Sequence, residues 1–293
     1  MSRQTFSGTG VAIITPFRED ESIDFKSLEK LLEYCIGKGV DYIVALGTTG
    51  ESVTLTKDEK HAVINFVVDV VNKRIPVVAG LGGNYTSEVI SSVKSWNFEG
   101  INAVLSVAPY YNKPSQQGLY QHFKSIADVC PVPVIIYNVP GRTGSNISGE
   151  TTVKLAREVK NIIAIKEASG NMSQIMHIVR NKPADFLVIS GDDVLTLPMI
   201  AVGGTGVISV IANAYPKEYS DMVRFALEGN MKKAIELHYL LIEMIWAIFA
   251  EGSPPGIKAV LSVLGIAGNH LRLPLVPVTA ELYKRIATLT KKI

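Results

Sequence analysis

The stretch NIIAIKEASGN (161–171) places a lysine at the end of an apolar, strand-forming run. Residues 162–165 are apolar and rich in β-branched side chains, which favour a buried strand, and the following SGN has the turn-forming residues that end one. Because side chains alternate along a strand, Lys166 is predicted to share a face with the small Ala164, while Ile163 points the other way. An ammonium group on the small-residue face of a buried strand needs an explanation.

Seven similar apolar runs occur elsewhere in the chain, and most are followed by a loop and a segment with helical periodicity. The runs are GVAIITP (10–16), YIVALG (42–47), PVVAGLG (76–82), AVLSVAP (103–109), PVIIYNV (133–139), FLVISGD (186–192) and GVISVI (206–211). Most strand ends are about 25 to 35 residues apart, which is the length of a βαβ unit.

Eight apolar strands that alternate with helices predict a closed (β/α)8 TIM barrel, an α/β fold whose parallel sheet is buried on both faces. An open doubly wound sheet is the alternative, but the first strand is not followed by the glycine fingerprint GxGxxG of that fold. The residues after the eighth strand have helical patterns only. We therefore predict a barrel over residues 1–224 and a C-terminal helical appendage over residues 225–293.

The composition and charge of the chain argue against several classes of binding partner. Of the 293 residues 47% are hydrophobic, the net charge is +2, and there is no basic run, which argues against nucleic acid or a membrane surface as a partner. The N-terminal MSRQTFSGTG lacks the apolar core of a signal sequence, and Cys35 and Cys130 form no CxxC, so a cytoplasmic location is expected. No histidine pair or acidic motif has metal-ligand spacing, and no metal is predicted.

The barrel offers an explanation for Lys166. Residues at the C-terminal ends of barrel strands line the mouth in which active sites are built. The lysine can extend from the strand end to solvent, as lysines commonly do. Alternatively, a partly desolvated amine has a lowered pKa and can attack a carbonyl to form an imine.

Other strand ends carry polar residues with two possible interpretations each. Tyr137 is predicted to face inward, either as a packed core residue or as a group that shuttles protons. The motif GTTGES (47–52) either binds a carboxylate or forms a plain strand-to-helix turn. Arg142 is either a solvated surface residue or a bidentate ligand for a second carboxylate.

Several motifs resemble, in order along the chain, those of the dihydrodipicolinate synthase family, which uses pyruvate to open the diaminopimelate and lysine pathway. The motifs are GTTGE (47–51), PYYNKPSQQGLYQHF (109–123), YNVPGRTG (137–144), IKEASGN (165–171) and SGDD (190–193). By this resemblance, Lys166 forms a Schiff base with pyruvate. Tyr137 and Thr49 belong to a proton relay, which is completed by Tyr111 from a neighbouring subunit.

The resemblance also implies how the substrates are bound. Thr48 and Thr49 match the site of the pyruvate carboxylate, and the backbone carbonyls of Gly191 and Ile208 face the bound pyruvate. Arg142 matches the ligand for the carboxylate of L-aspartate 4-semialdehyde. The product is 4-hydroxy-tetrahydrodipicolinate, no cofactor is needed beyond the imine, and the assembly is a homotetramer made of two tight dimers.

Three other functions are compatible with a barrel of this kind. N-acetylneuraminate lyase shares the barrel and the lysine, but it typically lacks an arginine after the YNVPG motif. A catalytically silent, pyruvate-binding regulatory barrel is the alternative outside enzymes. A phosphate site at GGTGVIS (203–209) is weakly supported, because glycines occur there in many barrels.

Residues of a regulatory pocket for lysine are also implied by the resemblance. Lysine-sensitive members bind the end product at the dimer interface, in a pocket that Ser52, Asn84, Glu88 and Tyr110 resemble. Lys60 stands where such members often have histidine. A second cation there would repel the ammonium group of the ligand, so weak sensitivity to lysine is predicted, unless Lys60 is simply a solvated residue of the first helical turn.

Overall fold

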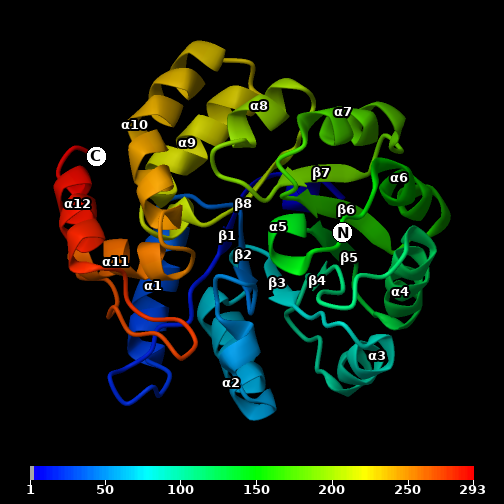
Figure 1. Cartoon of the computed structure of the whole chain (residues 1–293), viewed down its shortest axis with the longest axis horizontal. Coiled ribbons are helices and arrows are strands. Elements are labelled where there is room, and N and C mark those ends of the chain that lie inside the picture. Colours follow the sequence, from blue (N-terminus) through cyan, green and yellow to red (C-terminus); the bar gives the residue numbers. More distant parts are fainter. Residues whose placement is uncertain (1–2) are drawn as a thin grey trace.

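The apolar runs pair in sequence order into one closed parallel barrel (Figure 1). The computed structural model describes residues 3–293, so Met1 and Ser2, with which the predicted barrel segment begins, lie outside the described residues. The strands are β1 (Gly8–Ala12), β2 (Tyr42–Ala45), β3 (Val77–Gly80), β4 (Ala103–Val107), β5 (Val134–Asn138), β6 (Ile162–Glu167), β7 (Leu187–Ser190) and β8 (Gly206–Ser209). The predicted (β/α)8 barrel is confirmed.

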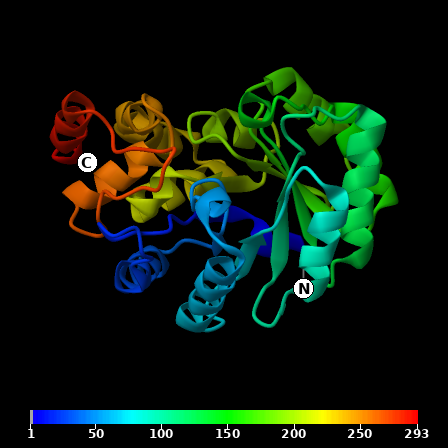
Figure 2. The ribbon, with the colours of Figure 1, turned by 60° about the horizontal axis from the view of Figure 1, so that its bottom comes forward.

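Helices surround the barrel and then continue beyond it (Figures 1 and 2). The helices that alternate with the strands are α1 (Phe25–Gly37), α2 (Lys57–Val71), α3 (Thr86–Ser95), α4 (Gln116–Val129), α5 (Pro140–Thr143), α6 (Gly149–Glu158), α7 (Met172–Asn181), α8 (Thr196–Ala201) and α9 (Pro216–Leu227). The C-terminal helices are α10 (Met231–Phe249), α11 (Pro255–Val263) and α12 (Ala280–Thr290). Three short 3₁₀ helices are η1 (Arg3–Phe6), η2 (Ser52–Thr54) and η3 (Ile211–Asn213).

Every predicted strand is present, and every strand except β6 ends before its apolar run does. β2, for example, ends at Ala45, and the next residue, Leu46, has a left-handed backbone with φ of +59°. The last residues of the runs therefore leave the ladder and turn into the loops of the barrel mouth. This is why the turn-forming and polar residues of the runs lie at the mouth.

The predicted alternation of faces along β6 is wrong for one residue. Val134 pairs with Ile162 but the next residue of β5, Ile135, pairs with Ala164, so the register shifts past Ile163. Ile163 and Ala164 consequently both belong to the cluster inside the barrel. Beyond this bulge the alternation resumes, and Lys166 keeps its predicted inward position.

The interior of the barrel is a compact apolar layer. Its residues come from all eight strands or lie next to them, and include Ala12, Tyr42, Val44, Val78, Leu105, Ile135, Ala164, Ile189 and Ile208. Phe6, which precedes β1, contacts Tyr42 edge to face with ring centroids 5.7 Å apart. A Cβ at Gly10 would lie 2.2 Å from the ring of Tyr42, so glycine at position 10 makes room for this aromatic side chain.

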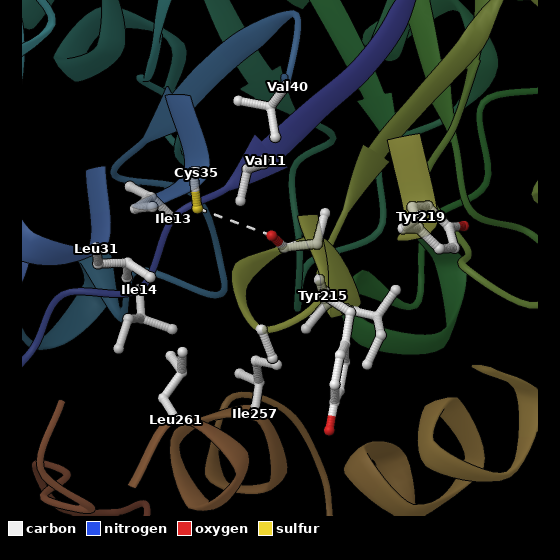
Figure 3. Close-up of a cluster of buried hydrophobic side chains, with 14 of the residues drawn as sticks. Val11, Ile13, Ile14, Leu31, Cys35, Val40, Tyr215, Tyr219, Ile257 and Leu261 are labelled. Atoms are coloured by element: carbon white, nitrogen blue, oxygen red, sulfur yellow. Dashed lines mark hydrogen bonds between the residues drawn. The ribbon is translucent and has the colours of Figure 1, made fainter. Parts of the chain in front are cut away.

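A second layer lies between the strands and the surrounding helices, and it includes the C-terminal region. Figure 3 shows one part of it, where Ile257 and Leu261 of α11 belong to the same buried cluster as Ile14, which follows β1, and Leu31 of α1. The thiol of Cys35 lies 3.8 Å from the carbonyl oxygen of Ala212 in the same cluster. The C-terminal helices therefore share a core with the barrel.

The C-terminal helices lie together at one side of the barrel, as Figures 1 and 2 show in orange and red. The helix α9 runs across residues 224 and 225, so the predicted division falls inside a helix, and it stays a prediction. Within residues 3–293, no helix has the length and apolarity needed to cross a membrane.

Candidate active site

A buried lysine and a buried tyrosine face each other at the barrel mouth. Lys166, the penultimate residue of β6, pairs in register with Tyr137, the penultimate residue of β5. Both side chains point inward, and the residues are only 5% and 6% exposed. The ammonium nitrogen Nζ of Lys166 lies 4.3 Å from the centroid of the Tyr137 ring. The structure thus brings together the two residues that the strand pattern placed on the inner face.

Glycine at position 191 makes room for the lysine. A Cβ built on Gly191 would lie 3.0 Å from Cε and 3.1 Å from Cγ of Lys166, and 2.9 Å from Cβ of Ala168. These distances are shorter than ordinary carbon contacts. Any other residue at position 191 would therefore push the lysine side chain from its place.

The environment of Lys166 favours its neutral form. The pKa of Lys166 is lowered to about 8, mainly by burial; the negative charge of Asp193 opposes this shift, and the positive charge of Arg142 contributes to it. Burial also raises the pKa of Tyr137, while the charge of Arg142 and a hydrogen bond with Thr48 act in the other direction. Near neutral pH the site therefore contains a protonated phenol beside an amine that deprotonates readily, which are the groups that imine formation needs.

Asp193 is a part of the site to which the sequence analysis assigned no role, although the SGDD motif contains it. The residue is 2% exposed, and its carboxylate accepts hydrogen bonds from the backbone N–H groups of Val210 and Ile211, at 3.0 and 2.8 Å. Burial raises the pKa of this carboxyl group to about 6, and the hydrogen bonds oppose the rise. Asp193 joins the loops after β7 and β8. The sequence contains one indication of this role, because Asp193 is the second of two acidic residues that follow shortly after the end of β7.

The turn after β2 holds the two threonines that were predicted to bind a carboxylate. Thr49 is buried, while Thr48 is exposed and forms the hydrogen bond to Tyr137. The backbone N–H of Gly50 donates to the carbonyl of Gly47, and that of Glu51 donates to the carbonyl of Thr48, both at 3.1 Å. The structure therefore brings this turn to the tyrosine, and the contact runs through Thr48.

Arg142 lies in the short helix α5, which follows β5 directly. Its side chain is exposed, and Nη2 donates a hydrogen bond to the carbonyl of Ser253 at 3.3 Å. The charge of Arg142 affects the pKa of both Lys166 and Tyr137, so the guanidinium lies within electrostatic reach of the reactive pair. A cation that is exposed at the mouth can bind an incoming carboxylate.

A buried polar network supports the site from the outer face of the barrel. Glu167 and Asn138, each next to a site residue in the sequence, are fully buried and joined by hydrogen bonds from the amide Nδ2 to both carboxylate oxygens at 3.1 Å. The carboxylate also accepts from the backbone N–H of Ser169 at 2.7 Å and from Nε2 of Gln174 at 3.1 Å. These bonds fix the ends of β5 and β6 relative to each other.

Tyr111 is not among the buried side chains around Lys166. It follows β4, has a left-handed backbone with φ of +69°, and is 89% exposed. Its backbone N–H donates to the carbonyl of Thr143 at 3.3 Å, which ties this loop to α5. The predicted role of its hydroxyl in a neighbouring subunit stays a prediction. Ile208, in contrast, lies in β8 inside the barrel.

The residues of the predicted regulatory pocket lie on the segments that follow β2, β3 and β4, which are neighbours in the barrel. They are Ser52 in η2, Lys60 in the first turn of α2, Asn84 before α3, Glu88 in the first turn of α3, and Tyr110 after β4. Lys60 is half-buried and Glu88 is exposed. Their assembly into one pocket stays a prediction. Among residues 3–293, no cluster of three or more His, Cys, Asp or Glu side chains is placed to hold a metal ion.

Comparisons with known proteins place the chain in a family. Residues 5–293 match the Dihydrodipicolinate synthetase family. The chain is 52% identical over 290 residues to the 4-hydroxy-tetrahydrodipicolinate synthase of Flavobacterium psychrophilum, covering 99% of each protein. It is 51% identical over 293 residues to that of Parabacteroides distasonis, covering 100% of this chain and 99% of the relative.

The fold has close counterparts among solved structures. One is the chloride-inhibited dihydrodipicolinate synthase of Acinetobacter baumannii in complex with pyruvate, with a TM-score of 0.95, 40% identity and coverage of 98% of both chains. The match to the family extends over the barrel and the C-terminal helices alike. This chain is a member of the dihydrodipicolinate synthetase family.

Proposed function

We propose that this protein is a 4-hydroxy-tetrahydrodipicolinate synthase, which condenses pyruvate with L-aspartate 4-semialdehyde through a Schiff base on Lys166. The observation that carries the chemistry is the buried amine of Lys166, with its pKa lowered to about 8, beside the phenol of Tyr137. The full-length relatives at about half identity support the choice of substrates.

The first half-reaction forms an imine. The lone pair of Nζ attacks the carbonyl carbon of pyruvate, and the carbonyl oxygen leaves as water after it has received two protons, one of them from the amine. Burial keeps Tyr137 protonated at neutral pH, so its hydroxyl can supply the second proton. In this proposal Thr48 and Thr49 bind the pyruvate carboxylate, and the backbone carbonyls of Gly191 and Ile208 face the substrate.

The second half-reaction forms a carbon–carbon bond. Loss of a methyl proton converts the imine to an enamine, whose carbon attacks the aldehyde carbon of the semialdehyde. Arg142, exposed at the mouth, binds the carboxylate of this second substrate. The amino group of the semialdehyde then attacks the imine carbon, closes the ring and releases Lys166, so that one water is lost overall and the aldehyde oxygen remains as the hydroxyl of the product.

The proposal is tested by two assays on the purified protein. Pyruvate with aspartate semialdehyde should be turned over, whereas N-acetylneuraminate should not be cleaved. Borohydride with pyruvate should add a stable mass to the peptide that contains Lys166, and Lys166→Arg should not be labelled, because a guanidinium stays protonated. Labelling of a different lysine, or cleavage of the sugar acid at a comparable rate, would contradict the proposal.

We infer further that the working form is a homotetramer built from two dimers, as in the resembled family. The exposed side chain of Tyr111, on a loop with a left-handed backbone, supports a position at a contact between subunits. A cytoplasmic location also stays a proposal. It is supported by Cys35 and Cys130, which are both buried free thiols, as expected in a reducing compartment.

A further inference from the structure

A buried ion pair joins the C-terminal region to the turn that follows β2. Nζ of Lys258, in α11, lies 2.5 Å from Oε1 of Glu51, and both side chains are fully buried. The same nitrogen donates a hydrogen bond to the carbonyl of His270 at 2.8 Å and lies 4.2 Å from the centroid of the Phe17 ring. The other oxygen of Glu51 accepts from the backbone N–H of Arg272 at 3.3 Å. The glutamate is therefore held by α11 and by the segment that follows it.

Glu51 has an unfavourable backbone conformation at the end of this turn. Its φ is +51°, in the left-handed region that residues other than glycine rarely adopt. Its N–H donates to the carbonyl of Thr48 at 3.1 Å, and its own carbonyl accepts from the N–H of Thr54 at 3.0 Å. Such a conformation persists where the surroundings fix it. The anchored carboxylate of Glu51 is a constraint of that kind.

The other side of the turn is fixed by the end of the first strand. The hydroxyl of Thr15 donates to the carbonyl of Gly50 at 2.7 Å, and a Cβ on Gly50 would lie 3.2 Å from the carbonyl oxygen of Ile13. The turn is therefore clamped between the residues after β1 and the ion pair from α11. Loss of one side of this clamp would let Thr48 and Thr49 move.

The ion pair is not the only contact that holds α11 in place. Ile257 and Leu261 of the same helix already pack into the core with Ile14 and Leu31 (Figure 3). A fully buried ion pair is also an inefficient source of stability, because removing two charges from water costs about as much as their attraction returns. What the ion pair specifically does is hold Glu51, and with it the turn of residues 47–51, in one conformation.

We propose that Lys258 is a positioning residue for the reaction, which acts through its ion pair with Glu51 to hold the turn of residues 47–51 so that Thr48 and Thr49 meet the pyruvate carboxylate. This inference rests on the proposed function. It makes the C-terminal helix α11 a structural part of the pyruvate site. The carbonyl of Ser253, just before α11, also accepts a hydrogen bond from Arg142, so the same segment contacts both expected carboxylate sites.

The test is the double variant Glu51→Gln/Lys258→Met, which removes both charges together and leaves an oxygen to accept the N–H of Arg272. We expect it to fold, because no buried charge loses its partner. The pyruvate concentration that gives half-maximal borohydride labelling of Lys166, and the KM for pyruvate, should both rise about tenfold. The KM for aspartate semialdehyde should change less than about twofold. If the ion pair only stabilised the fold, its removal would change the KM values for pyruvate and for aspartate semialdehyde to a similar extent.

Two further variants keep the test decisive. Ile257→Val removes a buried methyl group from the same helix and should lower the melting temperature without moving the pyruvate KM. Glu51→Asp keeps both charges but shortens the reach by one methylene, and should raise the pyruvate KM about threefold. An unchanged pyruvate KM in the folded double variant or in Glu51→Asp would overturn the positioning role. Absence of labelling in the unmodified protein would instead overturn the proposed function, and the positioning role with it.

Discussion

Replacement of Lys166 by methionine is expected to abolish turnover and to stabilise the fold. Burial lowers the pKa of Lys166 from 10.5 to about 8, although the negative charge of Asp193 opposes the shift. The charged form is thus less stable in the folded protein than in the unfolded chain. A difference of this size corresponds to about 3 kcal/mol, because each pKa unit is worth about 1.4 kcal/mol. Methionine has a similar shape and avoids this cost.

The gain in stability should depend on pH in a defined way. The folded-state pKa lies below the unfolded value, so the unfolded chain binds more protons between pH 8 and pH 10.5 and the unmodified protein gains stability as the pH rises through that window. The advantage of Lys166→Met should therefore be full below about pH 8 and fade above it. The free energy of unfolding is measured by urea titration at pH 7 and at pH 9.5, with equal protein concentrations because subunit contacts can contribute.

A second buried lysine provides the control. Burial lowers the pKa of Lys258 to about 8 as well, but this lysine is paired with Glu51. Lys258→Met leaves a buried carboxylate without its partner and should cost about 3–5 kcal/mol. The two substitutions are therefore expected to have opposite signs. If Lys166→Met were no more stable than the unmodified protein at pH 7, the view that burial sets the pKa of Lys166 would be refuted.

Four other predictions concern the mouth of the barrel. Gly191→Ala should lower kcat at least tenfold, because the new Cβ meets Lys166, and an unchanged rate would show that the lysine tolerates displacement. Arg142→Ala should weaken productive binding of the semialdehyde by about 1.5–3 kcal/mol while pyruvate labelling survives, and equal damage to both steps would assign it a broader role. Mixing inactive Tyr111→Phe subunits with inactive Lys166→Ala subunits should restore activity; verified hybrids without activity would place Tyr111 in its own site or outside the chemistry. Free lysine should inhibit weakly and Lys60→His should strengthen inhibition, as rates at rising lysine concentrations will show; an unaltered response would exclude Lys60 as the cause.

The order and type of the elements were predictable because the strands of a parallel barrel are buried on both faces. Each strand therefore appears as a short apolar run, and the turn residues at its end lie at the mouth. The bulge at Ile163 was not predictable from alternation. It arises from the pairing of Val134 and Ile135 with the neighbouring strand, which is a property of two segments together.

The site was predictable where one strand end carries the chemistry by itself. Lys166 and Tyr137 are recognisable because each is a polar residue on the inward side of an apolar run. Asp193 and Glu51 are different, because their burial depends on partners from other parts of the chain. A sequence pattern treats a glutamate or a lysine as exposed by default, and only the fold shows which of them lose water.

The comparison of the two buried lysines shows why a lowered pKa alone does not identify a nucleophile. Burial lowers the pKa of each amine to about 8. The nitrogen of Lys258 is surrounded by the carboxylate of Glu51, the carbonyl of His270 and the ring of Phe17, so its hydrogen-bonding directions are occupied. Lys166 lies at the end of a barrel strand, beside a phenol that can exchange protons with it. The position of Lys166 at the mouth and the ion pair that occupies Lys258, rather than the pKa, therefore assign the nucleophile to Lys166 and the positioning role to Lys258.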